Sequence, residues 1–394
     1  MNVNQKKITQ WMLAAVVVCC TAMPMFTSCI KDEPANNECD VLSAWVDGAD
    51  YESYFYQKGQ MQVEALPSNV SEIVFTVRSL LSLPPMPVSF NLTPGATISP
   101  SSGTPQDFTS GPVTYTVTSE DGAWSREYKV LFREADLPTY KFSFEHVEEE
   151  LLESSNSTYH VFYETDETGL RHNIWSSGNQ GFAVVQSRLT PDKFPTKSSP
   201  DGYQGKCVCL TTQYAGDLAK MMGKPIAAGN LFLGSFNLIQ VLIDPLKATE
   251  FGIPVDKEPV RVTGYYKYKV GEKFTNKNMK VVPDRIDEAH IYAVFYRNTD
   301  ADGNKVVLYG DDVLTSPYIV RQAQLFSLPQ TDEWTRFEMF FEGDDADPAV
   351  LASLGYSMTL VFSSSRKGDV FEGAIGSTLY VDEVEVSFEK GEEE

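Results

Sequence analysis

The chain has 394 residues, of which 42% are hydrophobic, so it can bury the cores of two or three domains. Its formal net charge of −22 argues against nucleic acid as a partner, because nucleic-acid-binding proteins need a basic face. Aromatic residues make up 12% of the sequence, and stretches of alternating apolar and polar residues recur, which is typical of β-rich proteins.

Residues 1–28 predict a secretory signal peptide. Two lysines near the start precede the apolar residues 11–20, and small residues stand directly before Cys29. The apolar run, broken by Pro24, is shorter than the roughly 20 residues that a membrane-spanning helix needs. We therefore expect this segment to be removed after export and not to anchor the chain as a helix.

Thr27, Ser28 and Cys29 resemble the lipobox of bacterial lipoproteins, in particular those of the Bacteroidetes. The resemblance implies cleavage before Cys29 and acylation of this cysteine, whose acyl chains would bind a membrane at about 0.8 kcal/mol per buried CH₂ group. Residues 30–33 resemble the acidic signal that directs such lipoproteins to the outer face of the outer membrane. The alternative is an ordinary secreted protein with an incidental cysteine. Residues 29–40 are polar and predict a tether.

Residues 41–136 predict a small immunoglobulin-like (Ig-like) β-sandwich, because short alternating stretches are separated by turn residues. The stretches are 70–77, 88–92, 113–118 and 128–132. Segments 92–103 and 117–122 resemble the N-terminal Ig-like module of Bacteroidetes surface lipoproteins. In that family the module is mostly a stalk or spacer.

Residues 139–390 predict a second, larger all-β domain. The long alternating stretches are 258–270, 288–297, 335–342, 356–363 and 378–388. The last stretch alternates apolar and acidic residues, so one of its faces should be buried and the other solvated. About 250 residues with strands of this length suit a jelly-roll of two packed sheets. The predicted fold class is therefore all-β throughout.

Four strings in this second region carry a family resemblance. They are HNIWSSGNQG at 172–181, AAGNLFLGSF at 227–236, PVRVTGYYKYK at 259–269 and GSTLYVDE at 376–383. They resemble PCMD, a carbohydrate metabolism domain of Bacteroidetes lipoproteins, over roughly residues 140–390. The resemblance implies a jelly-roll similar to carbohydrate-binding modules and to glucanase-like sandwiches. It carries over no catalytic residue.

A sugar site needs an aromatic ring for stacking and polar groups for the hydroxyls. Trp175 stands before a polar, glycine-containing loop that reaches Asn179, which suits such a site. Alternatively, Trp175 fills the edge of the core and Asn179 caps a turn. Tyr265 and Lys267 share one face of a predicted strand, and this face is either a ligand platform or ordinary sheet packing.

Glu288, His290 and Tyr292 share one face of another predicted strand, opposite an apolar face. An acid, an imidazole and a phenol in line suit hydroxyl recognition, and the alternative is an ordinary wet sheet face. Most glycosidases need two carboxyls. Glu288 is the first candidate for a catalytic carboxyl among 54 acidic residues, and we expect a binding protein more than an enzyme.

The resemblance to jelly-roll carbohydrate modules also implies a structural calcium ion. Glu145 near the first strand and Asp382 on the last one stand where its ligands would meet. Calcium takes six to eight oxygen ligands. The alternative is that both are ordinary acidic residues on wet strands, and no other cofactor is expected.

Together these features predict a lipid-anchored protein of the outer membrane that faces the cell surface. Its jelly-roll domain would capture polysaccharide or oligosaccharide for utilisation, beside outer-membrane uptake proteins. One alternative is a glycoside hydrolase of the glucanase-like type. Another is a structural or adhesive cell-surface protein, which would present a large apolar patch in place of an aromatic-lined groove.

Overall fold

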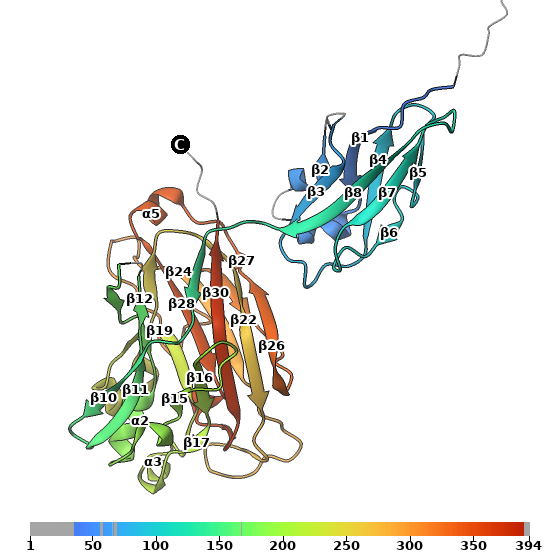
Figure 1. Cartoon of the computed structure of the whole chain (residues 1–394). Helices are drawn as coiled ribbons and strands as arrows, with labels where there is room; N and C mark the ends of the chain where they lie inside the picture. Colours follow the sequence, from blue (N-terminus) through green and yellow to red (C-terminus); the bar gives the residue numbers. More distant parts are fainter. Residues whose placement is uncertain (1–34, 56–57, 65, 67–68, 167, 390–394) are drawn as a thin grey trace, which may run out of the picture. The chain divides into compact units, whose positions relative to one another are not determined.

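The computed structural model describes residues 35–389 except 56–57, 65, 67–68 and 167. The predicted signal peptide, the predicted lipidation site Cys29 and the start of the predicted tether lie outside the described residues. The chain divides into two compact units, one ending at Asp136 and the other beginning at Leu137 (Figure 1). No helix in the part of the chain that the structure describes is long and apolar enough to span a membrane.

The N-terminal unit is a sandwich of two four-stranded sheets, with strand orders β2-β1-β4-β6 and β3-β8-β7-β5. Strand β3 runs parallel to β8. Because successive side chains of a strand point to opposite faces, every second residue enters the core between the two sheets. In β3 these residues are Ile73, Phe75 and Val77, which are fully buried. The elements are β1 (Val41–Val46), η1 (Ala49–Tyr54), η2 (Lys58–Met61), β2 (Gln62–Val63), β3 (Glu72–Val77), β4 (Met86–Leu92), β5 (Thr97–Ser99), β6 (Pro105–Gln106), β7 (Val113–Thr118) and β8 (Ser125–Glu134).

The C-terminal unit is a larger sandwich. One sheet has eight strands in the order β14-β19-β28-β24-β25-β27, with β20 on β19 and β21 on β28. These strands are β14 (Trp175–Ser176), β19 (Asn230–Phe236), β20 (Thr249–Phe251), β21 (Ile253–Val255), β24 (His290–Arg297), β25 (Ile319–Gln324), β27 (Glu342–Gly343) and β28 (Tyr356–Ser363). Neighbouring strands of this sheet run antiparallel to one another.

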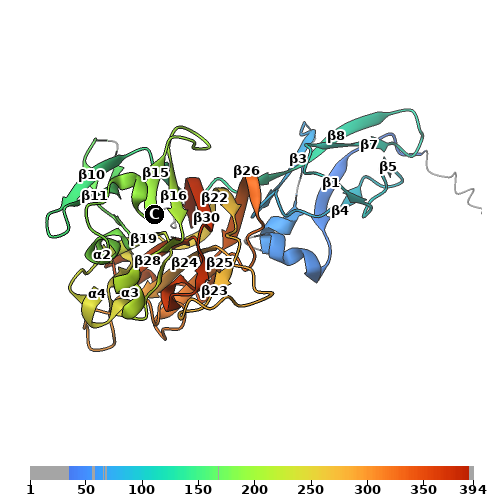
Figure 2. The same cartoon turned by 90° about the horizontal axis from the view of Figure 1, so that it is seen from below.

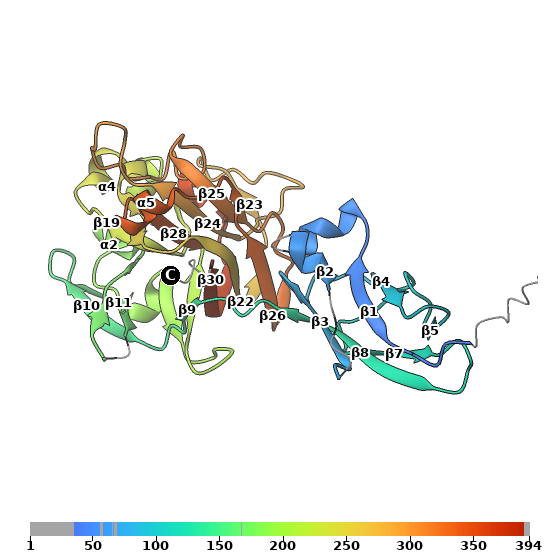
Figure 3. The same cartoon turned by 90° about the horizontal axis from the view of Figure 1, so that it is seen from above.

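The second sheet of this unit has six strands, in the order β15-β16-β30-β22-β26 with β9 on β30. They are β9 (Thr139–Phe142), β15 (Thr196–Ser199), β16 (Cys207–Thr211), β22 (Pro259–Lys269), β26 (Thr331–Phe340) and β30 (Thr378–Phe388). Figures 2 and 3 show the two sheets as the layers of the sandwich. The prediction of an all-β fold, a small sandwich followed by a larger one, is confirmed.

The remaining short elements connect these strands or lie over the two sheets. The two-stranded ribbons are β10 (Val147–Leu152) with β11 (Ser157–Phe162), β12 (Glu164–Thr165) with β13 (Arg171–His172), β17 (Gln213–Tyr214) with β18 (Ile226–Ala227), and β23 (Phe274–Thr275) with β29 (Gly373–Ala374). The helices are α2 (Asn179–Val185), η3 (Pro191–Lys193), α3 (Asp217–Met221), α4 (Gln240–Ile243), η4 (Pro245–Lys247), α5 (Pro348–Ala352) and η5 (Gly368–Val370).

The core between the two large sheets is aliphatic and aromatic. Strand β24 contributes Ile291, Ala293 and Phe295, and β30 contributes Val381, Val384 and Val386, all at most 1% exposed. At about 25 cal/mol per Å² of apolar surface, this burial is the main favourable contribution to folding of the unit.

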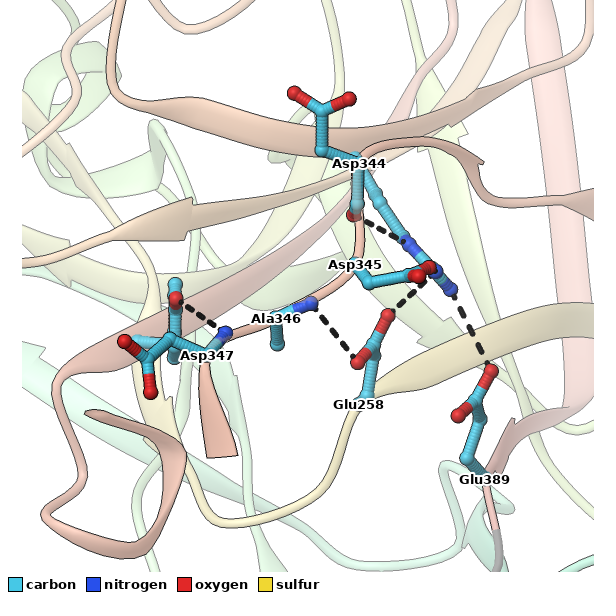
Figure 4. Close-up of polar contacts among 8 residues, drawn as sticks. Glu258, Asp344, Asp345, Ala346, Asp347 and Glu389 are labelled. Atoms are coloured by element: carbon cyan, nitrogen blue, oxygen red, sulfur yellow. Dashed lines mark hydrogen bonds and ion pairs between the residues drawn. The ribbon is translucent and has the colours of Figure 1, made fainter. Parts of the chain in front are cut away.

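An ion network ties β22 to β25 and to the end of the unit (Figure 4). Arg321 of β25 is 9% exposed. Its Nη2 lies 2.6 Å from Oε1 of Glu258 and 2.5 Å from Oδ1 of Asp345, and its Nη1 lies 3.8 Å from Oε1 of Glu389. The other carboxylate oxygen of Glu258 accepts a hydrogen bond from the amide of Ala346 at 3.1 Å. The network therefore holds the loop after β27 against the start of β22.

Replacing Arg321 with Met should lower the free energy of unfolding by about 3–5 kcal/mol, because the buried Glu258 would lose its cation. Chemical denaturation measures this loss. The control is Lys141→Met, which removes an exposed ion pair to Glu385 of 3.5 Å and should cost less than about 1 kcal/mol. Equal losses in the two variants would contradict the assignment.

Candidate functional site

A cavity of about 570 Å³ lies on the outer face of the eight-stranded sheet. Its floor comes from β19, β28, β24 and β25. Its walls come from α2, the ends of α3 and α4, η4, and the loops 310–315 and 365–371. In both Figure 2 and Figure 3, α2 and α4 lie beside β19 and β28. The sheet is therefore covered on both of its faces around this cavity.

Cross-strand register builds a polar row on the floor. Asn230 of β19 is paired with Ser363 of β28, and Ser363 is paired with His290 of β24. Because paired residues point to the same side of a sheet, the three side chains stand next to one another. All three line the cavity.

A second, mainly apolar row of side chains lies two residues further along each strand. Phe232 is paired with Val361, Val361 with Tyr292, and Tyr292 with Gln324 of β25. The rings of His290 and Tyr292 lie 4.6 Å apart, centroid to centroid, with an interplanar angle of 41°. The floor thus offers a ring beside polar atoms, which is the combination that saccharides need.

The sequence of β24 explains why its outer side is covered. Every residue from His290 to Tyr296 is buried. Ile291, Ala293 and Phe295 pack in the main core, while Tyr292, Val294 and Tyr296 pack in a second cluster on the other side. His290 and Tyr292 do share one face, but each is only 7% exposed. The alternative of a wet sheet face is therefore wrong for these two residues.

The environment of His290 keeps its imidazole neutral at pH 7. Burial lowers its pKa to about 4, and the positive charges of Arg366 and Lys367 act in the same direction, while the side chain of Gln324 opposes them. The Nε2 atom of His290 is buried and has no hydrogen-bond partner among the residues that the structure describes. A neutral imidazole can donate from one nitrogen and accept at the other.

Asp287 fixes the wall that carries Arg366 and Lys367. Its Oδ2 accepts hydrogen bonds from the hydroxyl groups of Ser365 (2.5 Å) and Ser377 (2.7 Å) and from the amide of Ala374 (2.8 Å). Asp287 is 2% exposed, and burial raises the pKa of its carboxyl above the usual range. One buried carboxylate, three residues before the start of β24, thereby joins this strand to the loop that closes the cavity.

Trp175 lies in the main core and not at the cavity. It is 3% exposed, and its ring packs edge-on against Phe142 with centroids 5.0 Å apart. Its Nε1 donates to Oε1 of Glu164 at 2.8 Å. This placement corrects the expectation of an exposed ring: Trp175 has no open face for a sugar.

Asn179 lines the cavity, but its amide group is used to hold the wall. It is 1% exposed, Nδ2 donates to the carbonyl of Thr196 at 2.7 Å, and Oδ1 accepts from the amide of Thr196 at 3.2 Å. Asn179 therefore joins the start of α2 to β15, and its side chain has a positioning role beside the cavity.

Tyr265 lies on the outer face of the other sheet. The ring of Tyr203, from the loop before β16, stacks on it with centroids 3.7 Å apart and an interplanar angle of 9°. Tyr203 also meets Trp334 edge-on at 6.4 Å. A ligand role for Tyr265 stays a prediction, and the structure separates it from His290 and Tyr292 by the thickness of the sandwich.

Glu288 lies outside the described lining of the cavity. Its carboxylate is 56% exposed and forms an ion pair with Nε of Arg366 at 3.3 Å. The structure thus brings together three of the predicted residues, namely Asn179, His290 and Tyr292, and places Trp175 and Glu288 elsewhere.

Glu145 and Asp382 both hold the loop that carries Tyr203. Oε1 of Glu145 accepts a hydrogen bond from the backbone amide of Lys206 at 2.7 Å. Oδ2 of Asp382 accepts a hydrogen bond from the backbone amide of Gln204 at 3.0 Å. Burial raises the pKa of Asp382 to about 6. Among the described residues, no group of three or more His, Cys, Asp or Glu side chains is arranged to hold a metal ion. A calcium ion at Glu145 and Asp382 stays a prediction.

A local sequence pattern also predicts part of the floor, at two residues that were not among the expected site residues. Asn230 and Phe232 stand two apart in β19, so alternation places them on one face. That this face meets His290 and Tyr292 depends on β28 lying between β19 and β24, which no local pattern reveals.

Residues 143–387, more than half of the chain, match the family model described as putative carbohydrate metabolism domain. The chain belongs to this carbohydrate metabolism domain family. Residues 59–131 match a second model, described as SGBP, N-terminal, where SGBP stands for surface glycan-binding protein. This family member thus joins an SGBP-type unit to the carbohydrate metabolism domain. No curated protein matches the chain.

Two crystal structures are similar to this family member. One, described as a putative glycoside hydrolase from Bacteroides thetaiotaomicron VPI-5482, is 36% identical, covers 92% of this chain and 100% of its own, and has a TM-score of 0.57. The other, described as a putative glycoside hydrolase from Bacteroides vulgatus ATCC 8482, is 40% identical, covers 63% of this chain and 98% of its own, and has a TM-score of 0.58.

Glu164, the partner of Trp175, predicts a pH dependence of stability. Burial raises its pKa from 4.5 to about 7, so the folded state binds the proton more tightly than the unfolded state. The free energy of unfolding should therefore fall as the pH rises from 4.5 to 7, by up to about 3 kcal/mol from this group. Glu164→Gln keeps an acceptor for Trp175 and should remove that fall in urea denaturation from pH 4.5 to 8. Parallel pH profiles for the two proteins would contradict the assignment.

Proposed function

We propose that this protein is a surface lipoprotein that captures saccharides in the cavity of its carbohydrate metabolism domain. The observation that carries the proposal is the floor of the cavity. Its polar row ends in the buried Nε2 of His290, which has no hydrogen-bond partner in the described part of the chain, and the ring of Tyr292 lies beside it. Leaving a buried polar atom unpaired costs about 1–3 kcal/mol, and a sugar hydroxyl at this position would recover that cost.

The size and enclosure of the cavity support a small-molecule or chain-end ligand. Its volume of about 570 Å³ lies within the roughly 300–1,000 Å³ of ligand pockets. A pyranose ring could place its C–H face against Tyr292 while one hydroxyl reaches His290. The neutral state of His290 suits this role, because an uncharged imidazole both donates and accepts.

The remaining parts of the proposal concern location. The SGBP-type unit supports a role at the cell surface, and acylation of Cys29 would supply the lipid anchor in the outer membrane. The N-terminal sandwich would then be the spacer between membrane and cavity. Outer-membrane uptake proteins would be the partners that receive the captured polysaccharide or oligosaccharide.

Affinity electrophoresis with a panel of plant, host and microbial polysaccharides tests the proposal on the full chain without its signal peptide. His290→Ala and Tyr292→Ala should each weaken retention at least 10-fold, which corresponds to about 1.4 kcal/mol. Tyr203→Ala removes an exposed ring of the other sheet and should leave retention unchanged. Thermal unfolding of each variant checks its fold. Retention by folded His290→Ala and Tyr292→Ala equal to that of the native protein would contradict the cavity as the site.

A glycoside hydrolase is the second candidate, because both relatives are described as such. Glycosidases use two carboxyls on either side of the bond they cleave. Asp311 and Asp369 line the cavity, but Asp311 forms an ion pair with Lys247 of 2.8 Å. An aspartate held in an ion pair with a lysine is better suited to binding a ligand than to acid–base catalysis.

We expect the protein to bind polysaccharides without cleaving them. Incubation with the glycans that it retains should release no reducing ends above the level of a double variant, Asp311→Asn with Asp369→Asn. Reducing ends that form with the native protein and disappear in this variant would establish the hydrolase instead.

A further inference from the structure

The cavity has a polar end with little hydrogen-bonding capacity left. Oδ1 of Asn230 already accepts the amide of Gly178 at 2.8 Å, and the hydroxyl of Ser363 donates to the carbonyl of Ser365 at 2.9 Å. His290 is therefore the member of the polar row whose nitrogen stays unpaired among the described residues. This end can bind a small number of sugar hydroxyls.

The lining beyond this row is largely apolar, although Thr249, Asp311 and Thr315 also lie in it. Beyond the row of Phe232, Val361 and Tyr292, further carbon side chains line it, namely Phe236, Val241, Leu246, Phe251 and Val313. An unsubstituted saccharide carries hydroxyl groups on nearly every ring carbon. Burying such hydroxyls here without partners would cost about 1–3 kcal/mol each, so an unsubstituted ring fits this end poorly.

One apolar side chain of the lining is also open to water. Met222 lines the cavity and is 43% exposed. An exposed apolar side chain at a cavity is stabilised when it packs against an apolar group of a ligand.

Three cationic residues line the cavity, namely Lys224, Arg366 and Lys367, and Lys224 is the one beside the apolar residue Val241. Lys224 lines the cavity, and its Nζ lies 3.4 Å from the carbonyl oxygen of Val241. An ammonium group only donates hydrogen bonds. It therefore matches a ligand group that only accepts them, such as an ester carbonyl attached to an apolar chain.

We propose that the cavity recognises saccharides that carry an ester-linked acyl group. The sugar lies at the polar end against His290, the acyl chain lies against Phe232, Phe251 and Val241, and the ester carbonyl accepts from Lys224. This inference rests on the proposed function and names the ligand class of the same site. Acetyl and aromatic acyl esters share this chemistry.

The test compares one polysaccharide before and after mild alkaline removal of its esters. Acetylated glucomannan, acetylated pectin and feruloylated xylan provide three backbones and both kinds of acyl group. The full chain without its signal peptide should be retained at least 10-fold more strongly by one or more esterified forms than by the matching de-esterified form. In Lys224→Met this preference should fall. Lys220 lies on α3 outside the described lining of the cavity, so the control variant Lys220→Met should keep the preference.

The outcomes separate this inference from the proposed function. Equal retention of esterified and de-esterified forms by the native protein would overturn the ester inference and leave saccharide capture in place. Retention of neither form, for any backbone and for the wider panel of polysaccharides, would contradict capture itself. Preference for acetylated or for feruloylated material identifies which acyl group the apolar end accepts.

Discussion

The burial of β24 on both faces is the constraint on which the rest of the C-terminal unit depends. A strand whose residues from His290 to Tyr296 are all buried cannot lie on a surface, so both sides of the eight-stranded sheet must be covered. The six-stranded sheet covers one side, and short helices and loops cover the other. Because α2, α3 and α4 have only four to seven residues each, they cannot fill the space above the sheet as a second sheet would. The space that remains is the cavity.

Buried carboxyl groups hold loops in place on both sides of the sandwich, and they do so by hydrogen bonding more than by charge pairing. Asp287 joins β24 to the loop with Arg366, and Asp382 holds the loop with Tyr203. Burial raises the pKa of both groups, although amide and hydroxyl donors oppose the shift. Arg321 with Glu258 is the contrasting case, in which charge pairing itself joins distant segments. Buried polar groups thus fix loops, while Nε2 of His290 in the cavity has no hydrogen-bond partner among the residues that the structure describes.

Local sequence patterns predicted the fold better than the site. Alternation in β3, β22 and β30 was enough to predict two sandwiches, since one buried residue in two requires a partner sheet. Alternation also correctly placed His290 and Tyr292 on the same face of β24. It could not show that both are covered, because the covering helices come from segments more than forty residues away. The polar loop after Trp175 suggested an exposed ring, whereas the alternative, that the ring fills the core, is what the structure shows; its partner Glu164 lies eleven residues earlier.

A crystal structure of the full chain without its signal peptide, bound to an oligosaccharide that it retains, tests the central claim most directly. The account predicts sugar density in the cavity, with a hydroxyl within hydrogen-bond distance of Nε2 of His290 and a ring against Tyr292. Density against Tyr203 and Trp334 on the opposite sheet, with an empty cavity, would contradict it.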